Sequence, residues 1–344
     1  MSSYNFSRIR ALIAEDDPNM RTILQMSLGA CGLDDIILTT SGGEAFQIIV
    51  GTEPDLVITD WRMAGGGGIE LVRRIRMAPN SPDPFLPIVM LSGYAHREQV
   101  MEARDAGVTD FLVKPISAKN LLTRIIAVIE NPRPFISTPD FFGPNRRGKN
   151  GADYDGPDNR TIEPAETPID TLAVSPEKDA LLDFADDTLP RIFRPPNRLR
   201  EKLGELDGPE PEFLIARIEA GIAELKDRYI SWANADLTAL YGALDAARAH
   251  LGNRQDHFDQ MNEIAHNMRG QAGTFDYPLI TEIGSSLCSL VDSAAKFGEV
   301  ELEAVEVHVQ AIHTVIGGKI EGPGDQRARE MLAGLAAVST KLLG

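Results

Sequence analysis

Short apolar runs alternate with amphipathic segments over the first 130 residues. The apolar runs lie at 9–14, 35–40, 55–59, 86–91 and 110–113. Segments with helical spacing of apolar residues separate them, for example 20–26 and 70–75. Five strands that alternate with helices predict a parallel sheet with helices on both faces, which is a doubly wound α/β fold. We assign this first domain to residues 8–130.

The hydrophobic pattern is lost between residues 131 and 209. Thirteen of the 22 prolines of the chain lie in 131–211, among frequent Gly, Asp and Asn. This composition predicts a Pro-rich, largely irregular linker. Two short stretches could be more ordered, because 179–185 has helical spacing and 191–196 mixes apolar and basic residues. We favour a solvated linker for both over docking on a domain.

Helical spacing returns from residue 210 to the end of the chain. The predicted helices are 211–228, 231–250, 255–274, 278–296, 301–317 and 325–342, with glycine or proline at most of the breaks. Residues 210–344 are therefore predicted to form an all-α bundle.

Composition narrows the classes of function. The formal net charge is −17 and the isoelectric point is about 4.8, which argues against a nucleic-acid-binding protein. Two distant cysteines make no disulfide or zinc framework. The first residues hold no long apolar core, so we expect no signal peptide there, and no apolar run in the sequence is long enough to span a membrane. We expect a cytoplasmic protein without membrane insertion.

Acidic residues follow the predicted strands of the first domain. Glu15 and Asp16 come directly after the first apolar run, and Asp60 comes directly after the third. The carboxyl ends of strands in an open parallel sheet form its ligand crevice. Ser92 and Lys114 follow the fourth and fifth runs, so the same edge gathers acids, a hydroxyl and an ammonium. Carboxylate oxygens suit Mg²⁺, and the combination suits phosphoryl transfer.

Residues 8–130 resemble a response-regulator receiver domain, a flavodoxin-like fold. The motifs are "LIAEDDPNMR", "LVITDWRM", "IVMLSG" and "FLVKP". The resemblance implies that Asp60 is the phospho-acceptor and that Glu15, Asp16 and the backbone carbonyl of Arg62 help to hold Mg²⁺. It further implies that Ser92 and Lys114 contact the phosphoryl group and that Phe111 is the aromatic switch residue. The peptide bond before Pro115 would be cis.

The loop after Asp60 departs from the receiver pattern. The family commonly has Met-Pro, two residues and Asp-Gly, whereas this chain has Met63, Ala64 and four glycines, 65–68. Glycine allows many backbone conformations. We therefore expect either a mobile loop beside the acceptor or a neutral change in a surface loop.

His266 is the candidate reactive residue of the helical region. At 100° per residue, Met261, Ile264, Ala265, Met268, Ala272 and Phe275 fall on the opposite side of its helix. Arg269 and two glycines, Gly270 and Gly273, lie on the side of His266. Glycine weakens a helix interior by about 1 kcal/mol relative to alanine. The pattern suggests an exposed histidine with space beside it for a partner; an ordinary surface histidine is the alternative.

This segment resembles a histidine-containing phosphotransfer (HPt) domain. The family carries His-x-x-Lys-Gly, and "HNMRGQAG" matches with Arg269 in place of the lysine. A second departure is Asp276, where family members often have glycine. The resemblance implies that His266 exchanges phosphoryl groups with receiver domains, with Arg269 and Gly270 beside it. The other histidines, 96, 250, 257, 308 and 313, lack metal-ligand spacing, and we expect surface or interfacial roles for them.

Together the two resemblances predict a two-component phosphorelay protein that uses Mg²⁺. A sensor histidine kinase or an HPt protein would act upstream, and the receiver domain of another regulator would act downstream. Nothing in the chain resembles an ATP-binding kinase domain, so whether it counts as an enzyme is open. The alternative is a phosphorylation-switched interaction module, whose helical bundle binds partners or dimerises without histidine chemistry.

Overall fold

The structure is a computed structural model that describes residues 4–63, 66–93, 97–138, 140–145, 165–166, 191–203, 208–249, 254–293 and 298–343. The chain folds into two compact units. One holds residues 1–113 and 118–217, and the other holds residues 114–117 and 218–344. Each unit is described by itself. No helix among the described residues is long and apolar enough to cross a bilayer.

The first unit is built on a five-stranded parallel sheet of order β2-β1-β3-β4-β5. Its strands are β1 (Arg10–Ala14), β2 (Asp35–Thr39), β3 (Leu56–Asp60), β4 (Ile88–Ser92) and β5 (Asp110–Val113). Every residue of β3 and β4 is buried, as expected for central parallel strands covered on both faces. The predicted fold class is confirmed, and the observed strands overlap all five predicted runs.

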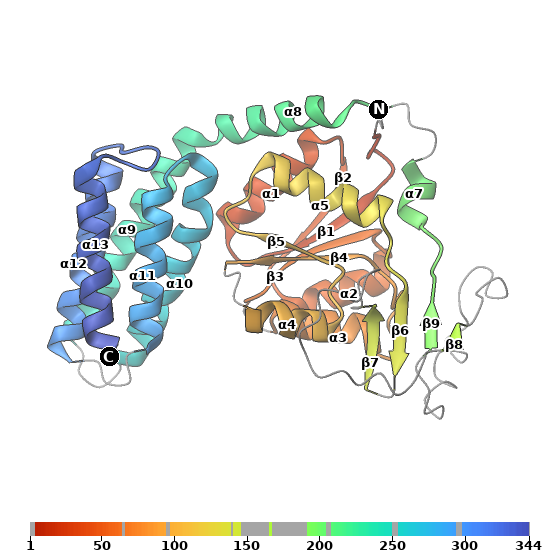
Figure 1. Cartoon of the computed structure of the whole chain (residues 1–344), viewed down its shortest axis with the longest axis horizontal. Coiled ribbons are helices and arrows are strands. Elements are labelled where there is room, and N and C mark those ends of the chain that lie inside the picture. Colours follow the sequence, from red (N-terminus) through yellow and green to blue (C-terminus); the bar gives the residue numbers. More distant parts are fainter. Residues whose placement is uncertain are drawn as a thin grey trace. The chain divides into compact units, whose positions relative to one another are not determined.

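Helices cover both faces of this sheet (Figure 1). On one face lie α1 (Pro18–Ala30) and α5 (Ala118–Glu130); on the other lie α2 (Gly42–Thr52), α3 (Gly68–Met77) and α4 (Arg97–Ala106). The face of α2 to α4 encloses a core cluster that includes Phe46, Val72 and Met90, each fully buried. The helices on both faces hold the strands in place, and the candidate site lies at the ends of these strands.

A second sheet belongs to the same unit and was not predicted. Its strands are β6 (Phe135–Thr138), β7 (Phe141–Pro144), β8 (Ala165–Glu166) and β9 (Arg191–Phe193), in the order β7-β6-β9-β8. The short helix α7 (Arg198–Leu203) follows. The stretch 191–196, for which we favoured a solvated linker, therefore contains a paired strand. The stretch 179–185 lies outside the described residues.

Aromatic burial explains why β6, β7 and β9 form within this Pro-rich region. Phe135, Phe142 and Phe193 form a buried cluster against the half-buried ring of Phe85. The Phe85 ring lies 5.0 Å from that of Phe135 and 5.2 Å from that of Phe142, both edge to face. Such pairs add about 0.5–1.5 kcal/mol beyond the burial of their area. Contacts among four rings thus stabilise a region whose sequence has no regular apolar pattern.

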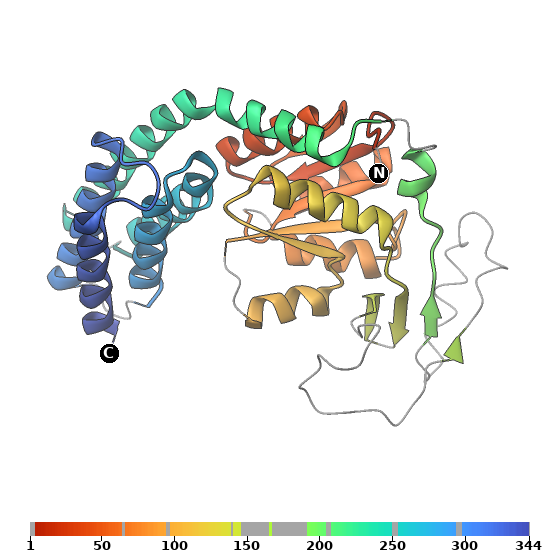
Figure 2. The same ribbon diagram turned by 45° about the horizontal axis from the view of Figure 1, so that its top comes forward.

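The remaining residues form helices (Figure 2). They are α8 (Pro211–Glu224), α9 (Lys226–Ala249), α10 (Arg254–Ala272), α11 (Pro278–Ser293), α12 (Glu299–Gly317) and α13 (Gln326–Leu343), with a 3₁₀ turn, η3, at Gly273–Phe275. Each coincides largely with one predicted helix, although the break between α8 and α9 lies at residue 225 and not at 229–230. In the second unit α11 packs against α10, α12 and α13, and α9 packs against α10 and α12. The predicted helical C-terminal region is confirmed.

Candidate functional site

Three carboxylates meet at the C-terminal edge of the parallel sheet. Glu15 and Asp16 follow the end of β1, and Asp60 is the last residue of β3. The two strands are neighbours, with Ala14 paired to Thr59, so their ends coincide. Carboxylate oxygens of Glu15, Asp16 and Asp60 lie within 4.8 Å of one another. Glu15 and Asp60 are buried, and Asp16 is half-buried.

This donor set fits a hard divalent cation. Carboxylates at such spacing repel one another unless a cation joins them, and Mg²⁺ prefers oxygen ligands. Because Asp16 is half-buried, ions and water can reach the cluster. This access matters because Mg²⁺ usually keeps several water molecules as ligands.

The neighbouring Asp17 has a different task. Its carboxylate caps α1 by accepting hydrogen bonds from the backbone amides of Asn19 at 3.0 Å and Met20 at 3.3 Å. An acceptor at this position satisfies amides that have no partner within the helix. Asp17 is therefore a helix cap, and it is not one of the three clustered carboxylates.

Backbone contacts fix the acidic residues. Arg21 Nη1 donates to the carbonyl oxygens of Glu15 at 2.6 Å and of Asp16 at 2.8 Å. The backbone amide of Arg62 donates to Asp60 Oδ2 at 3.2 Å and so orients that carboxylate. Arg21 was not predicted from the sequence; its signal there is a cation five residues after Asp16, in the first turn of α1.

Ser92 and Lys114 lie at the same C-terminal edge of the sheet, as the strand register shows. Asp60 pairs with Leu91, and Ser92, the next residue of β4, pairs with Val113 of β5. Lys114 follows Val113 directly, and its peptide bond to Pro115 is cis, as the resemblance implied. Ser92 and Lys114 are both buried.

Phe111 lies within β5, where it pairs with Met90. Its side chain is half-buried and packs against the core cluster beneath α2 to α4. The aromatic side chain therefore stands between the core and the surface, as a switch residue would have to. Its role as the switch remains a prediction.

The glycines after Asp60 are tightly placed where the structure describes them. The carbonyl of Gly66, a residue with φ of 107°, accepts a hydrogen bond from the amide of Gly42 at 3.1 Å. The amide of Gly68 donates to the carbonyl of Trp61 at 3.0 Å. A β-carbon added at Gly67 would lie 2.9 Å from that same carbonyl oxygen. These contacts disfavour larger residues at Gly67 and Gly68, while mobility or neutral change of the loop stays a prediction; residues 64 and 65 lie outside the described part.

In the second unit, His266 lies on α10 and is half-buried. The predicted apolar side of the helix is buried except for Ile264, which is half-buried. Arg269 Nη2 lies 3.2 Å from His266 Nδ1. Arg269 and Gly270 are buried, so less space opens beside the histidine than the helical projection predicted.

Close packing of α11 accounts for part of the burial of Arg269. A β-carbon at Gly284 of α11 would come within 3.0 Å of the Arg269 β-carbon, so the absence of a side chain there lets the helices approach. Thr281 Oγ1 also donates to the Arg269 carbonyl at 3.2 Å. The arginine stem is packed, and its guanidinium reaches the imidazole.

His308 has no surface role; it lies at the interface of three helices. Its side chain is fully buried, and its Nδ1 donates to the Ala304 carbonyl at 2.7 Å. Its Nε2 then accepts from the hydroxyl of Ser286 at 2.9 Å, and Ser339 Oγ lies 2.9 Å from Ser286 Oγ. Burial lowers the pKa of His308. The cluster is a polar contact among α11, α12 and α13. His96 and His250 lie outside the described residues.

Comparison with known proteins matches residues 11–126 to the response regulator receiver domain model. The chain is 33% identical over 122 residues to chemotaxis protein CheY-3 of Vibrio cholerae, covering 36% of this chain and 92% of that protein. It is 29% identical over 123 residues to the phosphate regulon transcriptional regulatory protein PhoB of Pseudomonas aeruginosa. That match covers 36% of this chain and 52%, about half, of PhoB.

A similar solved structure is the receiver domain of NtrX from Brucella abortus. It is 26% identical, with a TM-score of 0.32, and the match covers 35% of this chain and 98% of that one.

Proposed function

Because the chain belongs to the response-regulator receiver family, in which an aspartate of the receiver domain is phosphorylatable, we propose that Asp60 is the phospho-acceptor. The observation that carries the proposal is the cluster of Asp60 with Glu15 and Asp16, whose carboxylate oxygens lie within 4.8 Å of one another. In the proposed reaction a carboxylate oxygen of Asp60 attacks the phosphorus of a donor phosphohistidine. The new O–P bond forms as the P–N bond breaks, and the donor nitrogen keeps the electron pair and takes a proton.

The residues around Asp60 have distinct tasks in this proposal. The Arg62 amide orients the carboxylate through its hydrogen bond to Oδ2. Glu15, Asp16 and Asp60 hold Mg²⁺, with the carbonyl of Arg62 as a further ligand, and the ion would neutralise charge on the phosphoryl oxygens. The Ser92 hydroxyl donates to one phosphoryl oxygen and the Lys114 ammonium pairs with another. Phe111 would respond to these contacts as the aromatic switch.

For the second unit we propose that His266 exchanges phosphoryl groups with receiver domains. Support comes from the HNMRG motif and from the approach of Arg269 to the ring. A guanidinium only donates hydrogen bonds, so Nδ1 accepts and the neutral ring carries its proton on Nε2. Attack by Nε2 therefore requires the Arg269 contact to break and the proton to move to Nδ1. Arg269 can then donate to a phosphoryl oxygen instead.

The proposed partners follow from this chemistry. A sensor histidine kinase or an HPt protein supplies the phosphoryl group to Asp60, and the receiver domain of another regulator takes it from His266. The competing function is an interaction module in which phosphorylation of Asp60 changes what the helical bundle binds. Buried Arg269 and Gly270 favour that alternative, because a docking partner needs room beside His266.

Phosphotransfer with the full chain tests both proposals. The donor is an HPt protein carrying radiolabelled phosphohistidine, with Mg²⁺ present. We expect Asp60→Asn to abolish acid-stable, base-labile label, and Asp17→Asn, the control one residue after the acidic pair, to leave it unchanged. Label that survives Asp60→Asn refutes the acceptor assignment.

The second arm concerns His266. We expect His266→Gln to abolish base-stable, acid-labile label, whereas His313→Gln, an exposed histidine of α12, retains it. If the label on Asp60 forms normally and no base-stable label appears in the wild-type chain, the interaction module is the correct function.

A further inference from the structure

A cavity of about 280 Å³ lies in the first unit, at the end of the parallel sheet away from the acidic cluster. Asp55, Leu86 and Thr109 line it close to the residues at which β3, β4 and β5 begin. Phe193 and Leu199, which belong to β9 and α7, line it from the other side. We call the segment 191–203 the roof. Without the roof this space would be part of the open surface of the sheet edge.

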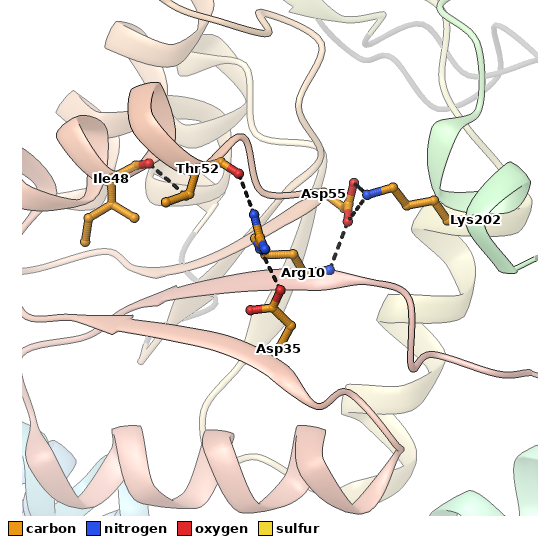
Figure 3. A network of polar contacts seen from close by, with 6 residues as sticks. All are labelled: Arg10, Asp35, Ile48, Thr52, Asp55 and Lys202. Atoms are coloured by element: carbon orange, nitrogen blue, oxygen red, sulfur yellow. Dashed lines mark hydrogen bonds and ion pairs between the residues drawn. The ribbon is translucent and has the colours of Figure 1, made fainter.

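Ion pairs and hydrogen bonds hold the roof in place without filling the space beneath it. Lys202 Nζ lies 2.7 Å from Asp55 Oδ1, and Asp55 in turn accepts a hydrogen bond from the Arg10 amide at 2.9 Å (Figure 3). Asn197 Nδ2 donates to the carbonyl of Ile129 at 2.5 Å. Polar contacts thus attach the roof directly before β3 and at α5.

The walls are aromatic and aliphatic. The rings of Phe85, Phe135 and Phe193 meet at the cavity, and the Phe85 and Phe193 centroids lie 6.3 Å apart. Ile49 and Val128 add buried aliphatic surface. Protein interiors are normally close-packed, so a space of this size beside three aromatic rings is unusual.

Four polar side chains of the lining have partners within the protein, while Glu53 and Arg133 line the cavity from exposed positions. Asp55 pairs with Lys202, and Asp83 pairs with Arg198 at 3.5 Å. The Thr109 hydroxyl accepts from the Ile88 amide, and the Ser81 hydroxyl donates to the Ile75 carbonyl. A charged ligand would lose water without gaining a free counter-ion from these pairs.

From this lining we propose that the cavity binds an uncharged aromatic molecule of one or two rings. An apolar cavity of roughly 150 Å³ takes up benzene, and small-molecule sites begin at roughly 300 Å³. The volume of about 280 Å³ therefore suits a molecule the size of indole. The site is separate from the acidic cluster and does not depend on phosphoryl transfer.

Indole is the test probe, titrated into the isotope-labelled full chain and followed by amide NMR shifts. We expect saturable shifts at Val128, Phe193 and Leu199. Val128→Phe places a ring in the cavity and should weaken binding at least tenfold. Leu38→Phe, an exposed position on β2, should not change it. Absence of saturable shifts at millimolar indole, or equal affinity in Val128→Phe, overturns the proposal.

Two further measurements control for misfolding of Val128→Phe and for the charge of the ligand. Leu199→Phe fills the cavity from the roof, so a folding defect of Val128→Phe cannot decide the result alone. Indole-3-acetate and tryptamine carry opposite charges on the same rings, and both should bind at least tenfold more weakly than indole. Tighter binding of either charged molecule would refute the uncharged class of ligand.

Discussion

The carbonyl oxygen of Asp60 occupies the space in which a β-carbon at Gly68 would have to lie. The neighbouring Trp61 carbonyl accepts the Gly68 amide, so the acceptor strand and the start of α3 are in direct backbone contact. Gly68→Ala must push these backbones apart. We expect it to lower the free energy of unfolding by about 1–3 kcal/mol and to slow phosphorylation of Asp60.

Gly29→Ala is the matched control for that change. A β-carbon at Gly29 meets nothing within 4 Å, and the residue lies within α1. Alanine there should raise the free energy of unfolding by up to about 1 kcal/mol. Urea unfolding measures both, and equal effects of the two substitutions would show that the contact at Gly68 does not matter.

Mg²⁺ binding should be visible through Trp61, which directly follows Asp60. The chain has two tryptophans, so Trp232→Phe leaves Trp61 as the only reporter. We expect Mg²⁺ to change Trp61 fluorescence saturably, and Asp16→Asn to weaken the apparent affinity at least about tenfold because it removes a ligand. Asp17→Asn retains the helix cap and should bind Mg²⁺ normally. Equal affinities in the two variants would exclude Asp16 as a ligand.

Arg76 makes several polar contacts at the junction between the two sheets. It is buried, and it donates to the carbonyls of Gly107, Pro84 and Leu86 at 2.8–2.9 Å while lying over the Phe135 ring. Burial lowers its pKa to about 9, which still leaves it charged at pH 7.

Removing this guanidinium leaves three carbonyls short of a donor. Arg76→Gln should therefore lower the free energy of unfolding by about 3 kcal/mol or more, since each buried unsatisfied group costs about 1–3 kcal/mol. Arg73→Gln, an exposed position on the same helix, should change it by less than about 0.5 kcal/mol. Urea unfolding followed at Trp61 distinguishes them, and a small effect at Arg76 would contradict the assigned contacts.

The helical unit should lose stability in mild acid through His308. Its folded-state pKa lies below the ordinary value of 6.5 because of burial, so the unfolded chain binds the proton more readily. The stabilisation is complete above pH 6.5 and declines as pH falls below it, at up to about 1.4 kcal/mol per pH unit. The groups facing the ring, Ser286, Ser339 and the Ala304 carbonyl, carry no charge that could offset this.

Urea unfolding between pH 7.5 and 5.5, followed at Trp232 in a Trp61→Phe background, measures the effect. His308→Gln should be less stable at pH 7.5 but should show a shallower dependence on pH. An unchanged dependence would mean that another group is responsible.

Much of the fold was predictable because local patterns determine it. The buried runs before Glu15 and Asp60 are continuous in apolar residues, and in a parallel sheet the strand ends meet wherever the register is regular. That placed the three carboxylates together without any knowledge of distances. The helices of the C-terminal region likewise follow from spacing and from the glycines and prolines between them.

The missed features depend on contacts between distant residues. Phe135 pairs with Phe193, 58 positions later, and neither segment has a periodic pattern long enough to predict a strand. His308 looks like any polar helix residue until Ser286 and Ser339 are placed beside it. Asp276 has φ of 66°, a left-handed conformation that suits glycine, and nothing in the helical spacing indicated it.

The pairing of β6 with β9 changes what the Pro-rich region does for the chain. The chain between Asn145 and Arg191 starts and ends on the second sheet and contributes its short strand β8, so it is an insertion within one body. Only residues 204–210 separate α7 from α8, and the carbonyl of Pro209 already accepts the amide of Tyr4. A cut between Asn145 and Arg191 should therefore leave two pieces that purify together. Shortening that segment should leave the reach of the covalent tether between receiver and bundle unchanged.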